Sequence, residues 1–168
     1  MNIKRVLISQ YLAALEMLKR TVDSCPDRVW ADVEPKNKFW HIAYHAIFYT
    51  HLYLQHTEED FIPWKGHRED LQFMGNLPGS SQDRPPVEQP FSKEELLEYL
   101  EYFREQVSTV VPALDLESGD SGFYWLPFNK LELQFYNIRH LQQHTGELCE
   151  RLGSDVGINV NWVGRVPQ

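Results

Sequence analysis

Four stretches of helical periodicity constrain this chain more than any other feature of its sequence. In each stretch, apolar side chains recur every three to five residues, which is the spacing that places them on one face of an α-helix. Each stretch has about 20 residues, so each would form a helix about 30 Å long. Four helices of similar length pack most simply as a bundle. We therefore predict an all-α fold, a four-helix bundle in which residues 1–168 form a single domain.

The first two predicted helices are bounded by prolines. The first spans about Asn2–Asp23, and Pro26 closes it soon afterwards. The second opens after Pro35, because proline is well tolerated in the first turn of a helix, and it runs to about His56. This second helix is rich in aromatic side chains, so we expect it to contribute heavily to the core.

The last two predicted helices begin at capping residues. Ser92 and Glu95 have the spacing of a capping box just before an apolar run, and the helix that they open ends near Pro112. Asn129 is a good N-cap for the last helix. Gly153 is the predicted end of that helix, because glycine favours the position that follows a helix terminus.

The connection between the second and third helices, residues 57–91, is unusually long and contains five prolines. Loops of this length are uncommon in compact domains and tend to be functional or disordered. It forms either a lid over one end of the bundle or a crossover wrapped on the bundle surface. Residues 115–128 form another connection, and we expect its aromatic side chains to pack onto the bundle: Phe123, Tyr124, Trp125 and Phe128. The alternation of apolar residues in 158–162 predicts an extended tail that covers an apolar edge.

Composition excludes several classes of function. The formal net charge is −8, and no cluster of lysine and arginine could neutralise several phosphates, so we expect no nucleic-acid partner. No apolar run approaches the roughly 20 residues that span a bilayer, so we expect no membrane insertion. Cys25 and Cys149 are the only cysteines and lie far apart, which is typical of a protein from the reducing cytoplasm.

Seven histidines are the residues that point most clearly to chemistry. His140 and His144 lie four residues apart in the last predicted helix, so their side chains share one face about 6 Å apart. His41 and His45 repeat this spacing in the second helix. Imidazole nitrogens bind zinc, nickel, copper and iron. The two pairs predict a divalent-metal site built from His140, His144 and a third ligand, which is either His41 or His45.

Other well-known catalytic patterns are absent from the sequence. The chain has no Glu-x-x-His of the di-iron bundles and no His-Glu-x-x-His of the zinc proteases. It also lacks the Gly-x-Ser-x-Gly elbow, the Walker phosphate loop and the Gly-x-Gly-x-x-Gly dinucleotide fingerprint. The histidines therefore remain the leading candidates for a functional site.

Two segments carry a resemblance to a known family. They are residues 39–50, Phe-Trp-His-Ile-Ala-Tyr-His-Ala-Ile-Phe-Tyr-Thr, and residues 137–148, Asn-Ile-Arg-His-Leu-Gln-Gln-His-Thr-Gly-Glu-Leu. On these segments the chain resembles the DinB/YfiT-like family of metal-dependent four-helix-bundle proteins. The family has one histidine on its second helix and a His-x-x-x-His followed by x-Gly-Gln/Glu near its end. The resemblance implies that His45, His140 and His144 are the metal ligands, and that His41 lies beside them or at the surface.

The resemblance also implies a range of activities. Some relatives are transferases or isomerases that use low-molecular-weight thiols such as bacillithiol or mycothiol, and others have no established reaction. We therefore expect a metal-dependent enzyme, a thiol S-transferase or a hydrolase, that acts on a small electrophilic molecule. Zinc and nickel fit the ligands best, ahead of iron and manganese. A homodimer is a further expectation from the resemblance.

Three residues near the histidines are candidate catalytic groups: Tyr49, one turn after His45; Asn137, one turn before His140; and Glu147, one turn after His144. Two other readings of the chain remain open. One is a non-catalytic, stress-related protein that binds a metal or a small ligand. The other is a metal-free bundle that acts only by dimerising through exposed aromatic side chains.

Overall fold

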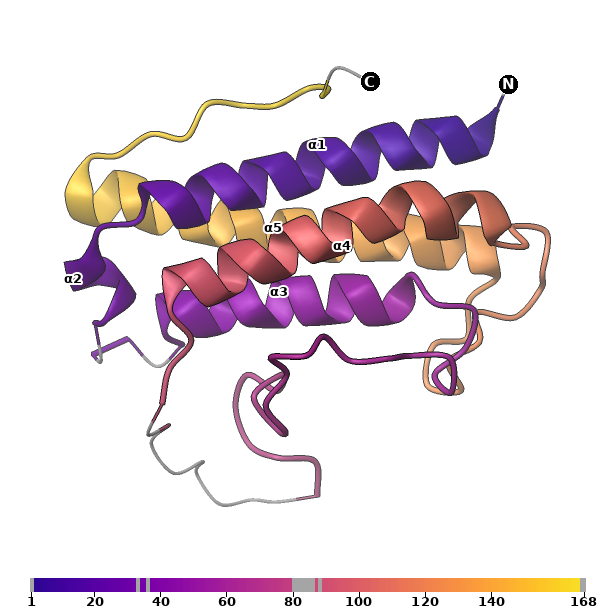
Figure 1. The fold of residues 1–168 in the computed structure, drawn as a ribbon, viewed down its shortest axis with the longest axis horizontal. Helices are drawn as coiled ribbons and strands as arrows, with labels where there is room; N and C mark the ends of the chain where they lie inside the picture. The colour runs from indigo at the N-terminus through magenta and orange to yellow at the C-terminus, as the bar shows by residue number, and fades with distance from the viewer. Residues whose placement is uncertain (1, 33, 36, 80–86, 88, 167–168) are drawn as a thin grey trace.

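The computed structural model describes residues 2–32, 34–35, 37–79, 87 and 89–166, and this part of the chain forms five α-helices without strands. They are α1 (Ile3–Ser24), α2 (Asp27–Trp30), α3 (Phe39–Tyr53), α4 (Lys93–Ala113) and α5 (Lys130–Val156). The four long helices run side by side as a bundle, and the single turn of α2 lies at one end of it (Figure 1). The prediction of an all-α bundle is confirmed.

Side-chain caps begin two of the long helices where the sequence predicts them. Ser92 accepts a hydrogen bond from the backbone N–H of Glu95, and the Glu95 carboxylate accepts one from the backbone of Ser92, which completes the capping box of α4. Asn129 accepts a bond from the backbone N–H of Glu132 at the start of α5. Each cap satisfies backbone donors that the first turn of a helix leaves unpaired.

Both ends of the second predicted helix were placed wrongly. The helix begins at Phe39 rather than just after Pro35, and it ends at Tyr53 rather than near His56. Its first turn starts where the buried side chains start, because Phe39 is fully buried. The helix therefore begins where burial of an apolar face stabilises it, and proline alone does not nucleate it.

The end of the last helix was also predicted wrongly. Helix α5 continues through Gly153 to Val156 and ends at Gly157, whose φ of 70° is the left-handed conformation that terminates many helices. A glycine inside a helix costs only about 1 kcal/mol. Burial of Leu152 and packing of Val156 against the core outweigh that cost.

Helix α3 has buried side chains on nearly every face. It packs against α4 and α5, and the long connection covers its remaining side (Figure 1). Trp64 of the connection stacks on Tyr99 of α4, with ring centroids 4.7 Å apart. The described part of the connection therefore follows the crossover alternative, since it wraps along the flank of the bundle.

The remaining segments cover the outside of the bundle. The tail runs extended along α1, as predicted (Figure 1). Val163 packs there against Ala13 and Met17. The alternating pattern was wrong for Trp162, which it placed on the covered edge and which is 73% exposed. In the connection 115–128, Phe123 is buried, but Tyr124 is 92% exposed, so the expectation that all four aromatics pack down was wrong for Tyr124. No helix in the described residues is both long enough and apolar enough to cross a membrane.

Candidate metal centre

Two neighbouring helices bring three histidines together. His45 is on α3, and His140 and His144 are one turn apart on α5, which runs in the opposite direction (Figure 1). One nitrogen from each ring lies within 4.8 Å of the others, and this is the only such cluster of metal-binding side chains among the described residues. The rings of His140 and His144 have centroids 4.7 Å apart, and each lies about as far from His45, at 5.1 Å and 4.9 Å.

The spacing of the closest pair of nitrogens suits a shared metal ion. Nε2 of His45 lies 3.2 Å from Nε2 of His140. In a tetrahedral zinc site with Zn–N bonds of about 2.0–2.1 Å, neighbouring nitrogens are about 3.3 Å apart. These two rings therefore already have the separation that one bound ion would require.

The tautomer of His45 follows from its other nitrogen. Nδ1 of His45 lies 2.7 Å from the backbone carbonyl oxygen of Gln72. A carbonyl only accepts hydrogen bonds, so the proton of the neutral ring is on Nδ1 and donates to Gln72. Nε2 then carries the lone pair and faces His140, which is the arrangement that a metal ligand needs.

His144 is oriented in a similar way by a carboxylate. Its Nδ1 lies 3.2 Å from Oε2 of Glu147, one turn further along α5. This contact favours a proton on Nδ1 and leaves Nε2 as the free ligand atom. His140 differs, because its Nδ1 is buried and has no hydrogen-bond partner among the residues that the structure describes. Its ring instead stacks on Tyr136, with an angle of 11° between the ring planes.

Burial keeps two of these rings uncharged. It lowers the pKa of His45 to about 3, and the neighbouring histidines lower that pKa further, while the bond to the Gln72 carbonyl opposes the change. Burial, together with the nearby His144, lowers the pKa of His140 to about 4. Both rings are therefore neutral near pH 7, and neutral imidazole is the form that binds a metal.

His41 does not belong to the cluster. Its Nε2 lies 2.8 Å from the carbonyl oxygen of Leu71, so this nitrogen carries a proton and donates to the long connection. Of the two possible third ligands, the structure therefore brings His45 and not His41 to the pair on α5. His51 and His67 also lie elsewhere, where their Nδ1 atoms contact the hydroxyl groups of Tyr99 and Tyr44.

The three candidate catalytic residues have different surroundings. The ring of Tyr49 lies 4.7 Å from that of His45 and 5.9 Å from that of His140. Glu147 contacts His144, and its side chain is 41% exposed. Asn137 is fully buried, and its amide donates to the Thr50 carbonyl at 3.0 Å, which ties α5 to α3 inside the core. Tyr49 and Glu147 thus adjoin the cluster, whereas Asn137 bonds to the backbone of Thr50.

Two neighbours of the cluster are not among the three candidate catalytic residues. Tyr136 precedes His140 by four residues, and the helical spacing that pairs the histidines also places it near their face, where it is found. The carbonyl of Gln72 belongs to the backbone of the long connection. Every residue has such a carbonyl, and no sequence signal marks the one that meets a histidine.

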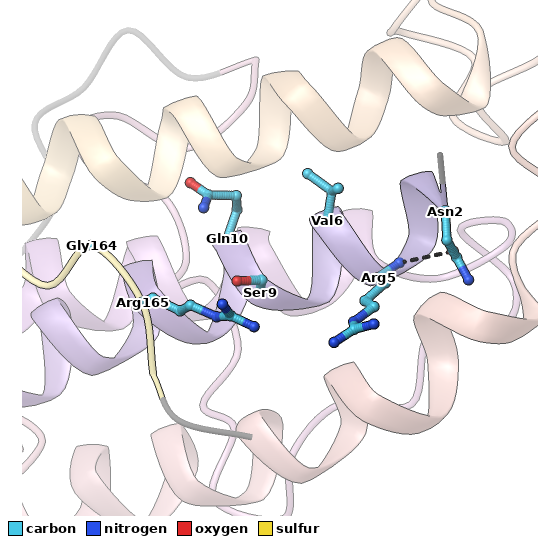
Figure 2. A pocket seen from close by; sticks show the side chains of 7 residues that line it. All are labelled: Asn2, Arg5, Val6, Ser9, Gln10, Gly164 and Arg165. Carbon is cyan, nitrogen blue, oxygen red and sulfur yellow. Dashed lines mark hydrogen bonds between the residues drawn. The ribbon is translucent and has the colours of Figure 1, made fainter.

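A groove elsewhere on the surface has a different character. Figure 2 shows it between the first turns of α1 and the tail, with Arg5 and Arg165 among the side chains that line it. Its volume is about 390 Å³, and its described lining contains no histidine, cysteine or carboxylate. It therefore lacks the ligands for a transition metal, and the three histidines remain the candidate centre.

Comparison with known families agrees with this geometry. The chain matches the model of the DinB superfamily over residues 10–148, which include α3, α4 and the part of α5 that carries both histidines. No curated protein and no solved structure matches the chain at a significant level. Because the family match covers well over half of the sequence, the chain belongs to the DinB superfamily.

Proposed function

We propose that this protein is a divalent-metal-dependent enzyme that transfers a low-molecular-weight thiol to a small electrophilic molecule. The observation that carries the proposal is the cluster of His45, His140 and His144, with two Nε2 atoms 3.2 Å apart. Three imidazoles leave at least one coordination position open, which is typical of catalytic rather than structural sites. Zinc or nickel fits this ligand set best, followed by iron or manganese.

A metal ion in this site would lower the pKa of a bound thiol or water, which makes either one a nucleophile at neutral pH. In the proposed transfer, the thiolate sulfur attacks an electrophilic carbon and a C–S bond forms. The bond to the leaving group breaks, and the leaving group departs with the electron pair. In hydrolysis at the same site, the oxygen of water would form a C–O bond in place of the C–S bond, and the same leaving group would depart with its electron pair.

The chain supplies groups that suit this reaction. Burial raises the pKa of the Tyr49 hydroxyl, so it stays protonated at neutral pH and can donate a hydrogen bond to an anionic leaving group. Glu147 accepts a bond from Nδ1 of His144, which strengthens that ring as a ligand. Asn137 acts indirectly, because its bond to Thr50 holds α5 in register with α3.

Metal content of the untagged protein is the first test. We expect about one equivalent in the wild type, lost in His45→Ala and in His144→Ala, because three protein ligands hold one ion. His56→Ala is the matched control, since His56 is exposed and lies outside the cluster. Wild-type protein that holds no metal after reconstitution with zinc or nickel would refute the proposal.

The reaction itself is tested with the metal-loaded protein. Glutathione, bacillithiol and mycothiol would each be supplied with a chromogenic aryl halide, and release of halide and formation of the thioether would be measured. We expect turnover with at least one thiol and none in His45→Ala. Metal binding without turnover of any thiol, and without hydrolysis of an ester, would favour the non-catalytic metal-binding protein.

We also propose that the protein is a homodimer, as the family resemblance implies, and that it is cytoplasmic, as its two distant cysteines suggest. Large exposed side chains such as Phe135 on α5, which is 56% exposed, are available for such a contact. Light scattering coupled to size-exclusion chromatography measures the mass directly. A monomer over the accessible concentration range would refute the dimer and leave the metal centre unaffected.

A further inference from the structure

Two histidines on α3 hold two successive carbonyls of the long connection. Nε2 of His41 lies 2.8 Å from the Leu71 carbonyl oxygen, and Nδ1 of His45 lies 2.7 Å from the Gln72 carbonyl oxygen. Histidines four residues apart share one face of a helix. The connection therefore docks on the same α3 face that carries the metal ligand, and the docked carbonyls are adjacent in its backbone.

The docked segment has a defined conformation. Asp70 has a φ of 67°, which is uncommon for a residue other than glycine and persists only when the surroundings hold it. The backbone N–H of Phe73 donates to the Asp70 carbonyl at 3.2 Å, and that of Leu71 donates to the Arg68 carbonyl at 3.3 Å. These bonds form a compact turn that presents the Leu71 and Gln72 carbonyls to α3.

His67 and Arg68, just before the turn, also tie the connection to the bundle. Nδ1 of His67 lies 2.6 Å from the hydroxyl of Tyr44 on α3. Arg68 bonds Glu95 of α4 at 2.5 Å, and its guanidinium lies 4.1 Å from the ring centre of Phe91. The segment is thus tied to the bundle at residues 67–68 by side chains, and at residues 71–72 by the two histidines.

We propose that His41 is a positioning residue for the metal centre. By holding the Leu71 carbonyl, it places the adjacent Gln72 carbonyl against Nδ1 of His45, which keeps the proton on Nδ1 and the lone pair on Nε2. This inference rests on the proposed metal site, because it assigns a role toward the ion that the site would hold. His41, the member of the α3 pair that is not a ligand, thereby has a function in the metal centre.

Metal binding and docking of the connection are linked by this arrangement. Coordination at Nε2 of His45 draws electron density from the ring and makes its Nδ1–H a stronger donor to Gln72. A bond that favours metal binding must be favoured by metal binding to the same extent. Loading the site should therefore slow hydrogen exchange in residues 69–73, and loosening that turn should weaken the affinity for metal.

The test compares zinc affinity in variants of one helix face, measured by competition with a chromogenic chelator. We expect His41→Leu to raise the Kd for zinc about 10–100-fold, as is usual when a group that orients a ligand is lost. His41→Gln should restore the affinity, because its amide N–H can donate to Leu71 from a similar position. Should the leucine variant fold poorly, His41→Asn removes the same bond with a shorter amide and should show the same loss.

Tyr44→Phe is the matched control. It removes a hydrogen bond between α3 and the same connection, but not one that reaches the Leu71 or Gln72 carbonyls. We expect its zinc affinity to fall much less than that of His41→Leu, because the bonds to the Leu71 and Gln72 carbonyls stay in place. An equal loss of affinity in Tyr44→Phe and His41→Leu would mean that general loosening of the connection is responsible, and would overturn the role of His41.

A second measurement needs no metal. Nitrogen NMR of ¹⁵N-histidine-labelled apoprotein reports which ring nitrogen of His45 carries the proton. We expect a proton fixed on Nδ1 in the wild type and in His41→Gln, and a mixture of tautomers in His41→Leu. An unchanged His45 tautomer in His41→Leu would refute the inference. Wild-type protein that binds neither zinc nor nickel would refute the proposed function instead, while the tautomer still decides what His41 does.

Discussion

Lys130 offers a stringent test of how the bundle holds α5, the helix that carries two of the three histidines. It is the first residue of α5 and only 4% exposed. Its ammonium donates to the backbone carbonyl of His56 at 2.6 Å, to that of Ser121 at close range, and more weakly to that of Gln55 at 3.4 Å. One buried cation thus joins the residues that follow α3, the connection 115–128 and the start of α5.

The perturbation is Lys130→Met, which keeps the length of the side chain and removes its charge. A net contribution of about 1.5–3 kcal/mol is typical for each hydrogen bond to a charged group. The two short bonds would therefore contribute about 3–6 kcal/mol. Burial of the ammonium opposes this, as the lowered pKa of Lys130 indicates. We expect a net loss of about 2–4 kcal/mol in the free energy of unfolding.

Urea denaturation at pH 7 measures this loss, and thermal unfolding provides a check. For a chain of 150–250 residues, each 1 kcal/mol corresponds to about 2–4 °C in Tm, so a fall of about 4–16 °C is expected. Lys4→Met is the matched control, because the Lys4 ammonium also donates to a carbonyl, that of Pro112 at 2.7 Å, but in a solvent-exposed position. A loss in Lys130→Met no larger than in Lys4→Met would refute the reasoning from burial.

Three further predictions follow from other contacts. Burial lowers the pKa of His51 to about 4 from about 6.5 in the unfolded chain. Because the folded state disfavours the proton, the neutral ring contributes about 3 kcal/mol above pH 6.5, and this contribution is lost as the pH falls toward 4. The pKa values of His45 and His140 are lowered too, so urea titrations at several pH values should show a smaller loss of stability in His51→Phe than in the wild-type apoprotein. Gly122→Ala should lower the free energy of unfolding by about 3 kcal/mol or more, because the φ of Gly122 is 86° and an added Cβ would lie 2.0 Å from the His56 carbonyl oxygen. Gly119→Ala is its control, and it should change the free energy of unfolding little because there is open space around Gly119. Glu147→Gln should weaken zinc binding about 10-fold in a calorimetric titration, since the neutral amide orients His144 less strongly, and an unchanged Kd would contradict that role.

The parts of the fold that sequence predicted well are those set by local chemistry. The capping box of Ser92 and Glu95 and the N-cap of Asn129 work within one turn, so their signals are complete in a few adjacent letters. The helix boundaries that were predicted wrongly depend on packing against residues that are distant in the sequence. Gly153 looks like a helix end locally, but packing of Leu152 in the core carries the helix past it.

The same division applies to the candidate centre. His140 and His144 share one face of α5 because of the 3.6-residue helical period alone, so their proximity was predictable without knowing which helix packs against α5. The helical period does not distinguish His41 from His45, because both belong to one i,i+4 pair on the same helix face, and only the family resemblance favoured His45. The physical reason lies in the position of α5 and the path of the connection along α3: the ring of His45 meets the α5 histidines, and the ring of His41 meets the Leu71 carbonyl.

That separation explains why a long connection matters to a site built from two helices. The proposed metal ligands come from α3 and α5, but the acceptor that sets the His45 tautomer is the Gln72 carbonyl, and it reaches His45 only because the connection returns along α3. A change in the connection can therefore alter the centre without touching a ligand. Insertions or substitutions near residues 69–73 should affect metal affinity more than equally disruptive changes in the tail, which packs on α1, away from the contacts that orient His45.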